Sequence, residues 1–390
     1  MGHFVFSVGD ASGDLYASRI TRKLKSLKPD CHISGIGGLL MQKEGAHLWA
    51  FTPPFGAFGL FSSLKVAPYH WLLLNKMKRS LLANPPDLFL PIDFGTFNRP
   101  LVRLLGRLGR KVFYYVPPSF VGESPEKVHR LVSPSVVFSP IYWWQKEILE
   151  KARAQIREFG HPLVDILTPY LTISPKVARD RLQLPSDRPI VALLPGSRRT
   201  TVADHARVLF RSAEKVHHLT GAHFAVALPD GWRREWIEPR IRPFLPAAAF
   251  SLHIGHSHWV LRASDVAVCA AGTATLEAAY LGTPSIAFFR THIANRLQLH
   301  WLRFKGLSVD RLGPFALPNR ILRQQVMPEL IGWTATEENL MDCLYHLIKD
   351  PDAQSQMTTD LIKVRDSMGE PGVLERVSQF VSEWAGERTV

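Results

Sequence analysis

Short apolar runs alternate with helix-length segments along the chain, and this pattern predicts an α/β fold. Ten runs rich in Val, Ile and Phe have the composition of strands that are buried on both faces. They span residues 3–8, 32–37, 87–92, 111–116, 135–139, 189–195, 223–228, 250–254, 265–271 and 284–289. Because helical stretches separate these runs, the order favours parallel sheets joined by right-handed crossovers.

A proline-containing stretch divides the strand candidates into two sets. Residues 159–176, "FGHPLVDILTPYLTISPK", hold three prolines, and the strand–helix alternation restarts near residue 189. This predicts two Rossmann-like, doubly wound domains that face a cleft: an N-terminal domain of residues 1–168 and a C-terminal domain of residues 169–368. Residues 369–390 are expected to form a final helix. In such sheets ligands bind beyond the carboxyl ends of strands, so the loops that follow strands are where chemistry is expected.

The charge balance favours an anionic partner. The chain has 47 Lys and Arg against 34 Asp and Glu, and residues 1–165 carry most of this excess, with 21 basic and 12 acidic residues. Nucleic acid, acidic lipid and phosphorylated ligands all fit such an excess. The sequence has no helix-turn-helix, RNA-binding motif or Cys/His finger, so we expect no nucleic-acid partner.

The cysteines and histidines show no metal-binding spacing. Cys31, Cys269 and Cys343 are far apart and form no CxxC pair, which favours a reduced, cytoplasmic setting. The 16 histidines form no HExxH pair, and we expect no metal site. The N-terminus also lacks the charged start and long apolar core of a signal peptide.

Two stretches of the first half have the composition of surface-binding elements. Residues 55–82 are apolar, with Trp71 to Leu74 followed by Lys76, Lys78 and Arg79. This is typical of an element that lies in a membrane interface, although a pair of core helices would look similar. Further on, one predicted helix face carries the arginine row Arg99, Arg103, Arg107 and Arg110. A solvated helix face and a face turned to an anion or a membrane both fit this row.

Two loops of the predicted C-terminal domain have the residues of a phosphate site. Gly196, Ser197 and Arg198 follow the strand run that ends near residue 195, and a helical pattern begins at about Val202. A glycine lets backbone N–H groups approach a phosphate, and an arginine adds a bidentate charge. A tight turn with a solvated arginine is the alternative.

The second of these loops follows the strand run 265–271. Gly272 and Thr273 open a helix there, and Glu277 lies one turn in, where it can meet a ribose hydroxyl pair. In the alternative interpretation, Thr273 is simply the helix cap.

Carboxylates follow two strand runs of the N-terminal domain. Asp93 ends the run 87–92 and is a candidate general base, or alternatively a helix-capping side chain. Asn98, two residues before Pro100, has the pattern of a helix cap. The turn "GDASGD" at residues 9–14 carries Asp10 and Asp14 around Ser12 and Gly13.

Together, these loops resemble one known family. "GDASGD", "PIDFGTFN", "FGHPLVD", "LLPGSR", "GTATLEA" and "LPN" occur in the order and spacing of lipid-A-disaccharide synthases, and the resemblance covers about residues 3 to 384. It implies the GT-B architecture, often with a final helix that crosses back to the N-terminal domain. It also implies inverting transfer of 2,3-diacylglucosamine from its UDP donor to 2,3-diacylglucosamine 1-phosphate, with no metal or cofactor. Members of this family are peripheral on the inner membrane. Whether this chain forms a homodimer is left open.

The resemblance also implies roles for individual residues. Asp93 would deprotonate the acceptor's 6-hydroxyl, and Arg290 would help to neutralise the leaving diphosphate. The remaining residues implied for the UDP donor are Gly196, Ser197, Arg198, Gly272, Thr273, Glu277 and Asn319, and those implied for the acceptor are Gly9, Asp10, Ser12, Gly13 and Asp14. Asp14 has an alternative role as the cap of the first helix.

The chain departs from the family pattern in its acceptor half. Residues 117–131 lack the family's tryptophan and following arginine and carry Glu123 and Lys127, and Asp10 stands where the family has Glu. A related transferase with another lipid acceptor, a sensor, and a UDP-sugar 2-epimerase-like enzyme therefore remain alternatives.

Overall fold

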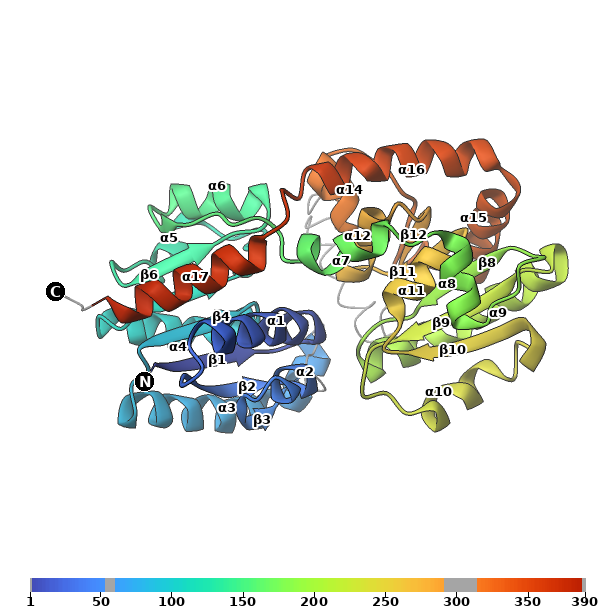
Figure 1. The fold of residues 1–390 in the computed structure, drawn as a ribbon. Helices are drawn as coiled ribbons and strands as arrows, with labels where there is room; N and C mark the ends of the chain where they lie inside the picture. The colour runs from blue at the N-terminus through green and yellow to red at the C-terminus, as the bar shows by residue number, and fades with distance from the viewer. Residues whose placement is uncertain (1, 53–59, 291–313, 388–390) are drawn as a thin grey trace. The chain divides into compact units, whose positions relative to one another are not determined.

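The chain folds into two compact units. The computed structural model describes residues 2–52, 60–290 and 314–387, and the side chains of residues 60–67 are outside this description. Unit 1 comprises residues 1–162 together with residues 370–390, and unit 2 comprises residues 163–369 (Figure 1). The predicted domain boundary at residue 168 lies inside α7 (Leu163–Leu171), the first helix of unit 2.

Unit 1 is built on a seven-stranded parallel sheet in the order β3-β2-β1-β4-β5-β6-β7. Its strands are β1 (His3–Val8), β2 (His32–Gly37), β3 (His47–Phe51), β4 (Leu88–Ile92), β5 (Val112–Tyr115), β6 (Val136–Ser139) and β7 (Gln155–Ile156). Its helices are α1 (Ala11–Leu27), α2 (Leu39–Lys43), α3 (Leu60–Ala83), α4 (Gly95–Arg107), α5 (Pro125–His129), α6 (Trp143–Lys151) and α17 (Val373–Gly386). The strand order reverses between β1 and β4, which makes that pair the topological switch point of the unit.

Helices cover both faces of this sheet because successive strand side chains point to opposite sides. On one face, Phe89 and Tyr114 pack with buried residues of α3 and α4. On the other, Phe113 contacts Phe380 of α17 with ring centroids 5.1 Å apart, and α17 packs against α1. Lys28, after α1, donates a hydrogen bond to the Ser382 carbonyl (2.7 Å). Val377 and Val381 of α17 are fully buried. Each such side chain stabilises the fold by about 1.5–3 kcal/mol, so residues 370–387 are an integral part of unit 1.

Unit 2 has a six-stranded parallel sheet in the order β10-β9-β8-β11-β12-β13. Its strands are β8 (Ile190–Leu194), β9 (His223–Leu228), β10 (Phe250–Ile254), β11 (Val266–Ala270), β12 (Ser285–Phe289) and β13 (Glu329–Ile331). Besides α7, its helices are α8 (Pro175–Leu182), α9 (Arg199–Thr220), α10 (Arg234–Ile241), η2 (Ala247–Ala249), α11 (Ser257–Ala263), α12 (Thr273–Leu281), α14 (Leu317–Leu322), α15 (Glu337–Lys349) and α16 (Pro351–Asp366). Its switch point lies between β8 and β11.

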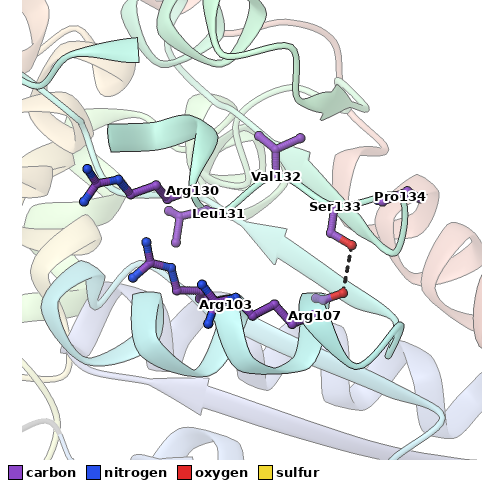
Figure 2. Close-up of a pocket in the computed structure, with 8 residues that line it drawn as sticks. Arg103, Arg107, Arg130, Leu131, Val132, Ser133 and Pro134 are labelled. Atoms are coloured by element: carbon purple, nitrogen blue, oxygen red, sulfur yellow. Dashed lines mark hydrogen bonds between the residues drawn. The ribbon is translucent and has the colours of Figure 1, made fainter. Parts of the chain in front are cut away.

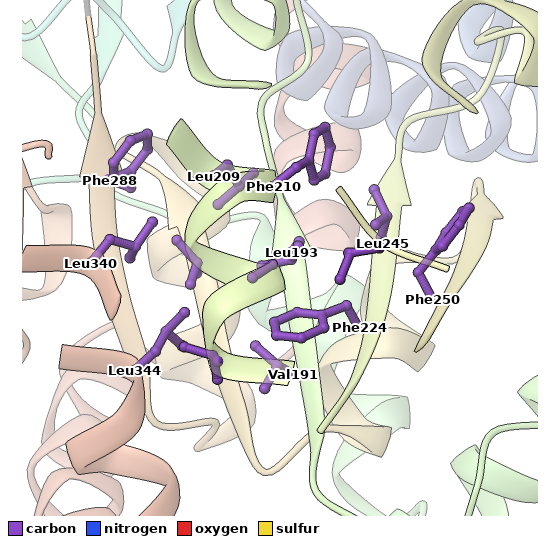
Figure 3. Close-up of a cluster of buried hydrophobic side chains, with 14 of the residues drawn as sticks. Val191, Leu193, Leu209, Phe210, Phe224, Leu245, Phe250, Phe288, Leu340 and Leu344 are labelled. Atoms are coloured by element: carbon purple, nitrogen blue, oxygen red, sulfur yellow. The ribbon is translucent and has the colours of Figure 1, made fainter. Parts of the chain in front are cut away.

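The core of unit 2 packs α9 against β8. Leu209 and Phe210 of α9 are buried with Leu193 of β8, as Figure 3 shows. Leu340 and Leu344, spaced one helical turn apart on α15, complete this layer. A packed helix–sheet layer of this kind holds the loop between β8 and α9 on a rigid base.

All ten predicted strands are present, and their bounds agree with the prediction to within one residue at each end. The α/β fold with two parallel sheets is therefore confirmed. Three further strands, β3, β7 and β13, were not predicted, and each lies at an edge of its sheet. β3 is half-exposed, while β7 and β13 have two and three residues. Such strands lack the continuous apolar run that marks a central strand.

The apolar stretch 55–82 has two faces where it is described. Residues 55–59 lie outside the described residues, and the rest of the stretch belongs to α3. Met77 is fully buried in the core, whereas Trp71 and Leu72 are 63% and 62% exposed. The helix therefore contributes to the core and also presents large apolar side chains to solvent. None of the helices in the described ranges combines the length and hydrophobicity needed to cross a bilayer.

Candidate active-site loops

Most of the predicted site residues lie at the switch points of the two sheets. In unit 1, the turn 9–14 follows β1 and Asp93 follows β4. In unit 2, the loop 195–198 follows β8, and residues 271–277 follow β11. At these places neighbouring strands send their connections to opposite faces of the sheet, which leaves a crevice for ligands.

The turn after β1 is held by its own side chains. Asp10 is the N-cap of α1, and its carboxylate accepts hydrogen bonds from the Gly13 N–H (2.7 Å) and from the Ser12 hydroxyl (3.1 Å). A Cβ at Gly13 would lie 2.9 Å from a methyl of Val8, so the protein itself fills the space beside this glycine. Asp10 and Ser12 are half-buried, and they are the polar side chains of the turn that still reach the surface.

Asp14 holds a neighbouring helix. It is buried, and its two carboxylate oxygens accept hydrogen bonds from the backbone N–H groups of Gly38 (2.8 Å), Leu40 (3.0 Å) and Met41 (3.1 Å) at the start of α2. Burial raises the pKa of Asp14, and these three hydrogen bonds partly oppose the increase. The alternative that Asp14 caps the first helix is wrong, because Asp10 occupies that position. An acceptor contact by Asp14 stays a prediction.

Asp93 occupies a strained backbone conformation. It has φ +47°, and the next residue, Phe94, has φ +51°, although neither is glycine. Such left-handed residues cost energy and persist where the surroundings hold them. Asn98 Nδ2 (2.9 Å) and the Tyr114 hydroxyl (2.8 Å) both donate hydrogen bonds to the Asp93 carbonyl. The half-buried Asp93 side chain is thus aimed by a fixed backbone.

The two loops of the unit 1 switch point contact each other. A Cβ on Gly9 would come within 2.1 Å of the Phe94 ring, so only glycine fits there. Asn98 of α4, fully buried, accepts a hydrogen bond from the Ser7 hydroxyl of β1 (2.5 Å) and so joins α4 to that strand. Asn98 is structural, as expected, but it is not a helix cap. Helix α4 begins at Gly95, after the left-handed Phe94.

Asp93 acts on two buried tyrosines that lie on either side of residues 117–131, the region that departs from the family pattern. Burial raises the pKa values of Tyr114 and Tyr142, and the nearby Asp93 carboxylate raises both further. Glu123 forms a bidentate ion pair with Arg99, whose guanidinium also lies 5.2 Å from the Phe120 ring. The acid that departs from the family pattern therefore fixes the first member of the arginine row.

In unit 2, the loop 195–198 presents the N-terminus of a long helix. Gly196 has φ +125°, and a Cβ there would lie 2.9 Å from Thr201 and 3.7 Å from Ala270, so the loop packs closely against α9 and the end of β11. Helix α9 begins at Arg199, earlier than the predicted Val202. Arg198 is its N-cap residue and forms no capping hydrogen bond. The first N–H groups of α9 are thus positioned to bind an anion.

A second helix begins at the neighbouring loop. Gly272 (φ +145°, ψ −149°) precedes α12, and no atom lies within 4 Å of where its Cβ would be. Thr273 is the first residue of α12 and is not its cap, since Gly272 occupies that position without a side-chain hydrogen bond. Glu277 Oε2 lies 3.5 Å from Nε2 of His258 on α11. The structure therefore brings two open helix starts and an acid to one switch point.

His205 was not predicted, and it connects two of these loops. Its Nδ1 lies 2.8 Å from the Pro195 carbonyl, and its Nε2 lies 3.1 Å from the Arg290 backbone N–H. The carbonyl can only accept and the N–H can only donate, so the ring is the neutral tautomer with a proton on Nδ1. Burial lowers its pKa to about 4. A histidine on the otherwise apolar face of α9, with Val202 and Leu209, is the signal that identifies such a residue.

Arg290 and Asn319 differ in their surroundings. Arg290 directly follows β12 and is half-buried. Asn319 is buried in α14, where Nδ2 donates to the Met327 carbonyl (2.9 Å) and Glu329 (2.8 Å), and Oδ1 accepts from the Val326 and Met327 N–H groups (2.8 and 3.0 Å). These contacts hold the approach to β13. A nucleotide contact by Asn319 stays a prediction.

The described part of the chain has no cluster of metal-binding side chains. No group of three or more His, Cys, Asp or Glu there is placed to hold a metal ion. The expectation that transfer needs no metal or cofactor stays a prediction.

Comparison with known sequences points to one family. A family model described as lipid-A-disaccharide synthetase matches residues 4–383. A lipid-A-disaccharide synthase of Dechloromonas aromatica is 33% identical over 348 residues, which cover 88% of this chain and 88% of that protein. One of Geobacter metallireducens is 29% identical over 391 residues, which cover 97% and 96%.

Solved structures with little sequence similarity share the fold. A UDP-GlcNAc 2-epimerase from Neisseria meningitidis bound to UDP-GlcNAc has a TM-score of 0.66 at 10% identity, covering 98% of this chain and 100% of that one. The calicheamicin glycosyltransferase CalG4 has a TM-score of 0.53 at 14% identity, covering 100% of both. At these identities the likeness concerns the fold alone, and it confirms the predicted GT-B architecture.

Proposed function

The chain belongs to the lipid-A-disaccharide synthetase family, and we propose that it transfers 2,3-diacylglucosamine from its UDP donor to 2,3-diacylglucosamine 1-phosphate. The observation that carries this proposal is the contrast between the switch points. Unit 1 presents Asp93 on a fixed backbone after β4, while unit 2 presents two uncapped helix starts and Arg198. A base and a diphosphate site are the two parts that this reaction needs.

In the proposed reaction, Asp93 acts as the general base. Its carboxylate takes the proton of the acceptor's 6-hydroxyl while that oxygen attacks the donor's anomeric carbon. A new carbon–oxygen bond forms, the bond from the anomeric carbon to the diphosphate breaks, and UDP leaves with the electron pair. Attack from the face opposite to UDP inverts the configuration. The proton on Asp93 then returns to solvent.

The proposed donor site is in unit 2. The starts of α9 and α12 and the Arg198 guanidinium would stabilise the charge that develops on the leaving diphosphate, and Arg290 would add to this. Glu277, oriented by His258, would accept hydrogen bonds from the ribose hydroxyls. Ser197 is exposed beside Arg198, where its hydroxyl can donate to a phosphate oxygen. Electrostatic stabilisation by these groups would require no metal.

The lipid acceptor is proposed to enter at unit 1 from a membrane surface. Trp71 and Leu72 of α3 are more than half exposed, and unit 1 contains most of the chain's positive excess. Large exposed apolar side chains beside basic residues are typical of interfacial helices. We therefore propose a cytoplasmic enzyme that is peripheral on the inner membrane, with the half-buried Asp10 and Ser12 in contact with the acceptor sugar.

The test is a transfer assay with defined substrates. Purified protein is incubated with UDP-2,3-diacylglucosamine and the monosaccharide 1-phosphate in mixed micelles, and both UDP release and the disaccharide mass are measured. Equal amounts of UDP and disaccharide, unchanged by EDTA, are expected. UDP release without an acceptor, or conversion of UDP-GlcNAc to its 2-epimer, would contradict the proposal. Transfer to other lipid sugars in parallel would identify an altered acceptor.

A further inference from the structure

Three arginines that the proposed reaction does not use surround a pocket in unit 1. The pocket has a volume of about 250 Å³ and lies between the second half of α4 and residues 130–134, which connect α5 to β6. Arg103 and Arg107 come from α4, and Arg130 comes from the facing wall (Figure 2). Arg103 and Arg107, two members of the arginine row, thus share a pocket with Arg130, which comes from another segment of the chain.

The pocket is separate from the candidate active-site loops. Residues 130–134 lead into the amino end of β6, whereas Asp93 follows the carboxyl end of β4. Because all strands of the sheet are parallel, these two positions lie at opposite ends of the strands. A ligand in the pocket is therefore not the sugar that Asp93 would deprotonate.

The three guanidinium groups lack acidic partners in the part of the chain that the structure describes. Their neighbour in the row, Arg99, is paired with Glu123, but Arg103, Arg107 and Arg130 form no ion pair with any described Asp or Glu. The Nε of Arg103 is also buried, and no described residue accepts a hydrogen bond from it. Buried donors usually have a partner, and an anion in the pocket would supply one for this nitrogen.

The walls of the pocket are held by packing. The Ser133 hydroxyl donates to the Gly106 carbonyl (2.9 Å), a bond that Figure 2 shows, and Leu131 is buried in the core. A Cβ on Gly106 would lie 3.0 Å from Val136 and 3.2 Å from Ser133, so this glycine lets the two walls approach. A site on preformed walls loses little freedom when it binds.

We propose that this pocket binds a phosphate group carried by a mono- or diester. Guanidinium groups pair with phosphate oxygens in a bidentate geometry, and three of them match an anion of one or two charges. One water takes about 30 Å³ in the liquid, so the pocket has room for a phosphate with a small polar substituent. A phospholipid headgroup and a soluble phosphate ester share this chemistry.

The first arm of the test uses a soluble ester. Glycerol 1-phosphate is titrated into the full-length protein by calorimetry, with Arg103→Gln/Arg130→Gln as the test variant. The matched control is Arg110→Gln/Lys127→Gln, which removes the same charge from exposed residues of unit 1 that do not line the pocket. Loss of two charge-assisted contacts should weaken binding by about tenfold or more in the test variant and by about twofold or less in the control.

The second arm uses a bilayer. Sedimentation with phosphatidylglycerol vesicles at physiological salt is compared with phosphatidylcholine vesicles for the same three proteins, and UDP binding checks that each is folded. Arg130→Glu alone, which leaves α4 intact, should reproduce the loss. If only binding of glycerol 1-phosphate is lost specifically in the test variant, the ligand of the pocket is a soluble ester. If binding to phosphatidylglycerol vesicles is lost specifically, the ligand is a lipid headgroup. Equal behaviour of the test and control variants in both arms, or no binding by the wild type in either, overturns the proposal.

Discussion

The switch points of the two sheets have the same topology, but their polar groups are used differently. In unit 1, Asp10 and Asp14 are engaged by backbone N–H groups, and the Asp93 carbonyl is held by Asn98 and Tyr114. In unit 2, the residues that precede α9 and α12 make no side-chain cap, and the buried Nε of Arg198 has no hydrogen-bond partner among the described residues. At the unit 1 switch point, α1 is capped by Asp10 and Asp93 is aimed by a fixed backbone, although α4 begins without a side-chain cap. At the unit 2 switch point, both helix starts and Arg198 leave donors for a ligand.

Removing the carboxylate that unit 1 aims gives the largest expected effect. Asp93→Asn keeps the size of the side chain but cannot accept the proton, so kcat should fall by about 10³-fold, within the range of general-base catalysis. UDP binding by unit 2, measured by calorimetry, should not change. Asp30→Asn removes an exposed acid from the same unit and should keep full activity. Wild-type turnover in Asp93→Asn would disprove the base assignment.

The open donors of unit 2 are tested next by Arg198→Gln. This variant removes a charge-assisted contact to the diphosphate, which is worth about 1.5–3 kcal/mol, so UDP should bind about 10–100-fold more weakly. Arg207→Gln, at an exposed position on the same helix, should bind UDP normally. Equal affinities of the two variants in calorimetry would remove Arg198 from the donor site.

The neutral His205 predicts an acid sensitivity of unit 2. Its pKa in the folded chain is about 4, below the ordinary value of 6.5, so the unfolded state binds the proton first as the pH falls. Its contribution to stability is therefore complete above pH 6.5 and is lost progressively toward pH 4. At pH 5.5 this loss amounts to about 1.4 kcal/mol.

Urea unfolding at pH 7.5 and pH 5.5 measures this sensitivity. His205→Phe cannot titrate, so its stability should fall less between these two pH values than that of the wild type, by about 1.4 kcal/mol. It should also be about 2–4 kcal/mol less stable at pH 7.5, because two buried backbone groups lose their partner. His218→Gln, exposed on the same helix, should behave as the wild type. An unchanged pH dependence in His205→Phe would contradict the lowered pKa of His205 and therefore its neutral state in the folded chain.

The smallest effect is expected for one of the two hydrogen bonds that hold Asp93. Tyr114→Phe removes the donor to the Asp93 carbonyl, but Asn98 Nδ2 still holds it, so stability should fall by about 1 kcal/mol. Since the aim of the carboxylate is partly kept, kcat should fall by less than about tenfold, with KM for the donor unchanged. Tyr345→Phe makes the same chemical change at an exposed position and serves as the control. An effect on donor KM instead of kcat would mean that Tyr114 does not position the base.

The sequence predicted the central strands well because burial on both faces leaves a continuous apolar run. It did not predict β3, β7 and β13, because an edge strand needs neither length nor a second apolar face. Glycines and acids after strands predicted where the loops lie. The sequence could not show which of those acids stabilise the fold, because this depends on contacts between distant segments. The contact of Asp14 with the start of α2 is one example.

Contacts between segments that are distant in sequence also explain why His205 was not predicted at the site. His205 binds Pro195 and Arg290, and the Arg290 end of this bridge is 85 residues away in sequence. The spacing of the arginine row was visible in the sequence, but the different surroundings of its members were not. In the structure Glu123 forms an ion pair with Arg99, while Arg103 and Arg107 line a pocket together with Arg130. Side chains whose role depends on a distant partner cannot be assigned from local pattern.

The position of α17 in unit 1 has a consequence for biosynthesis. Translation produces residues 1–162 first, but their sheet lacks the helix that covers Phe113 until residues 370–387 have emerged. Residues 163–369 form a continuous unit, which can fold as soon as it leaves the ribosome. The half that is made first is therefore completed last, and a nascent chain that stalls before α17 exposes an uncovered aromatic sheet face to chaperones.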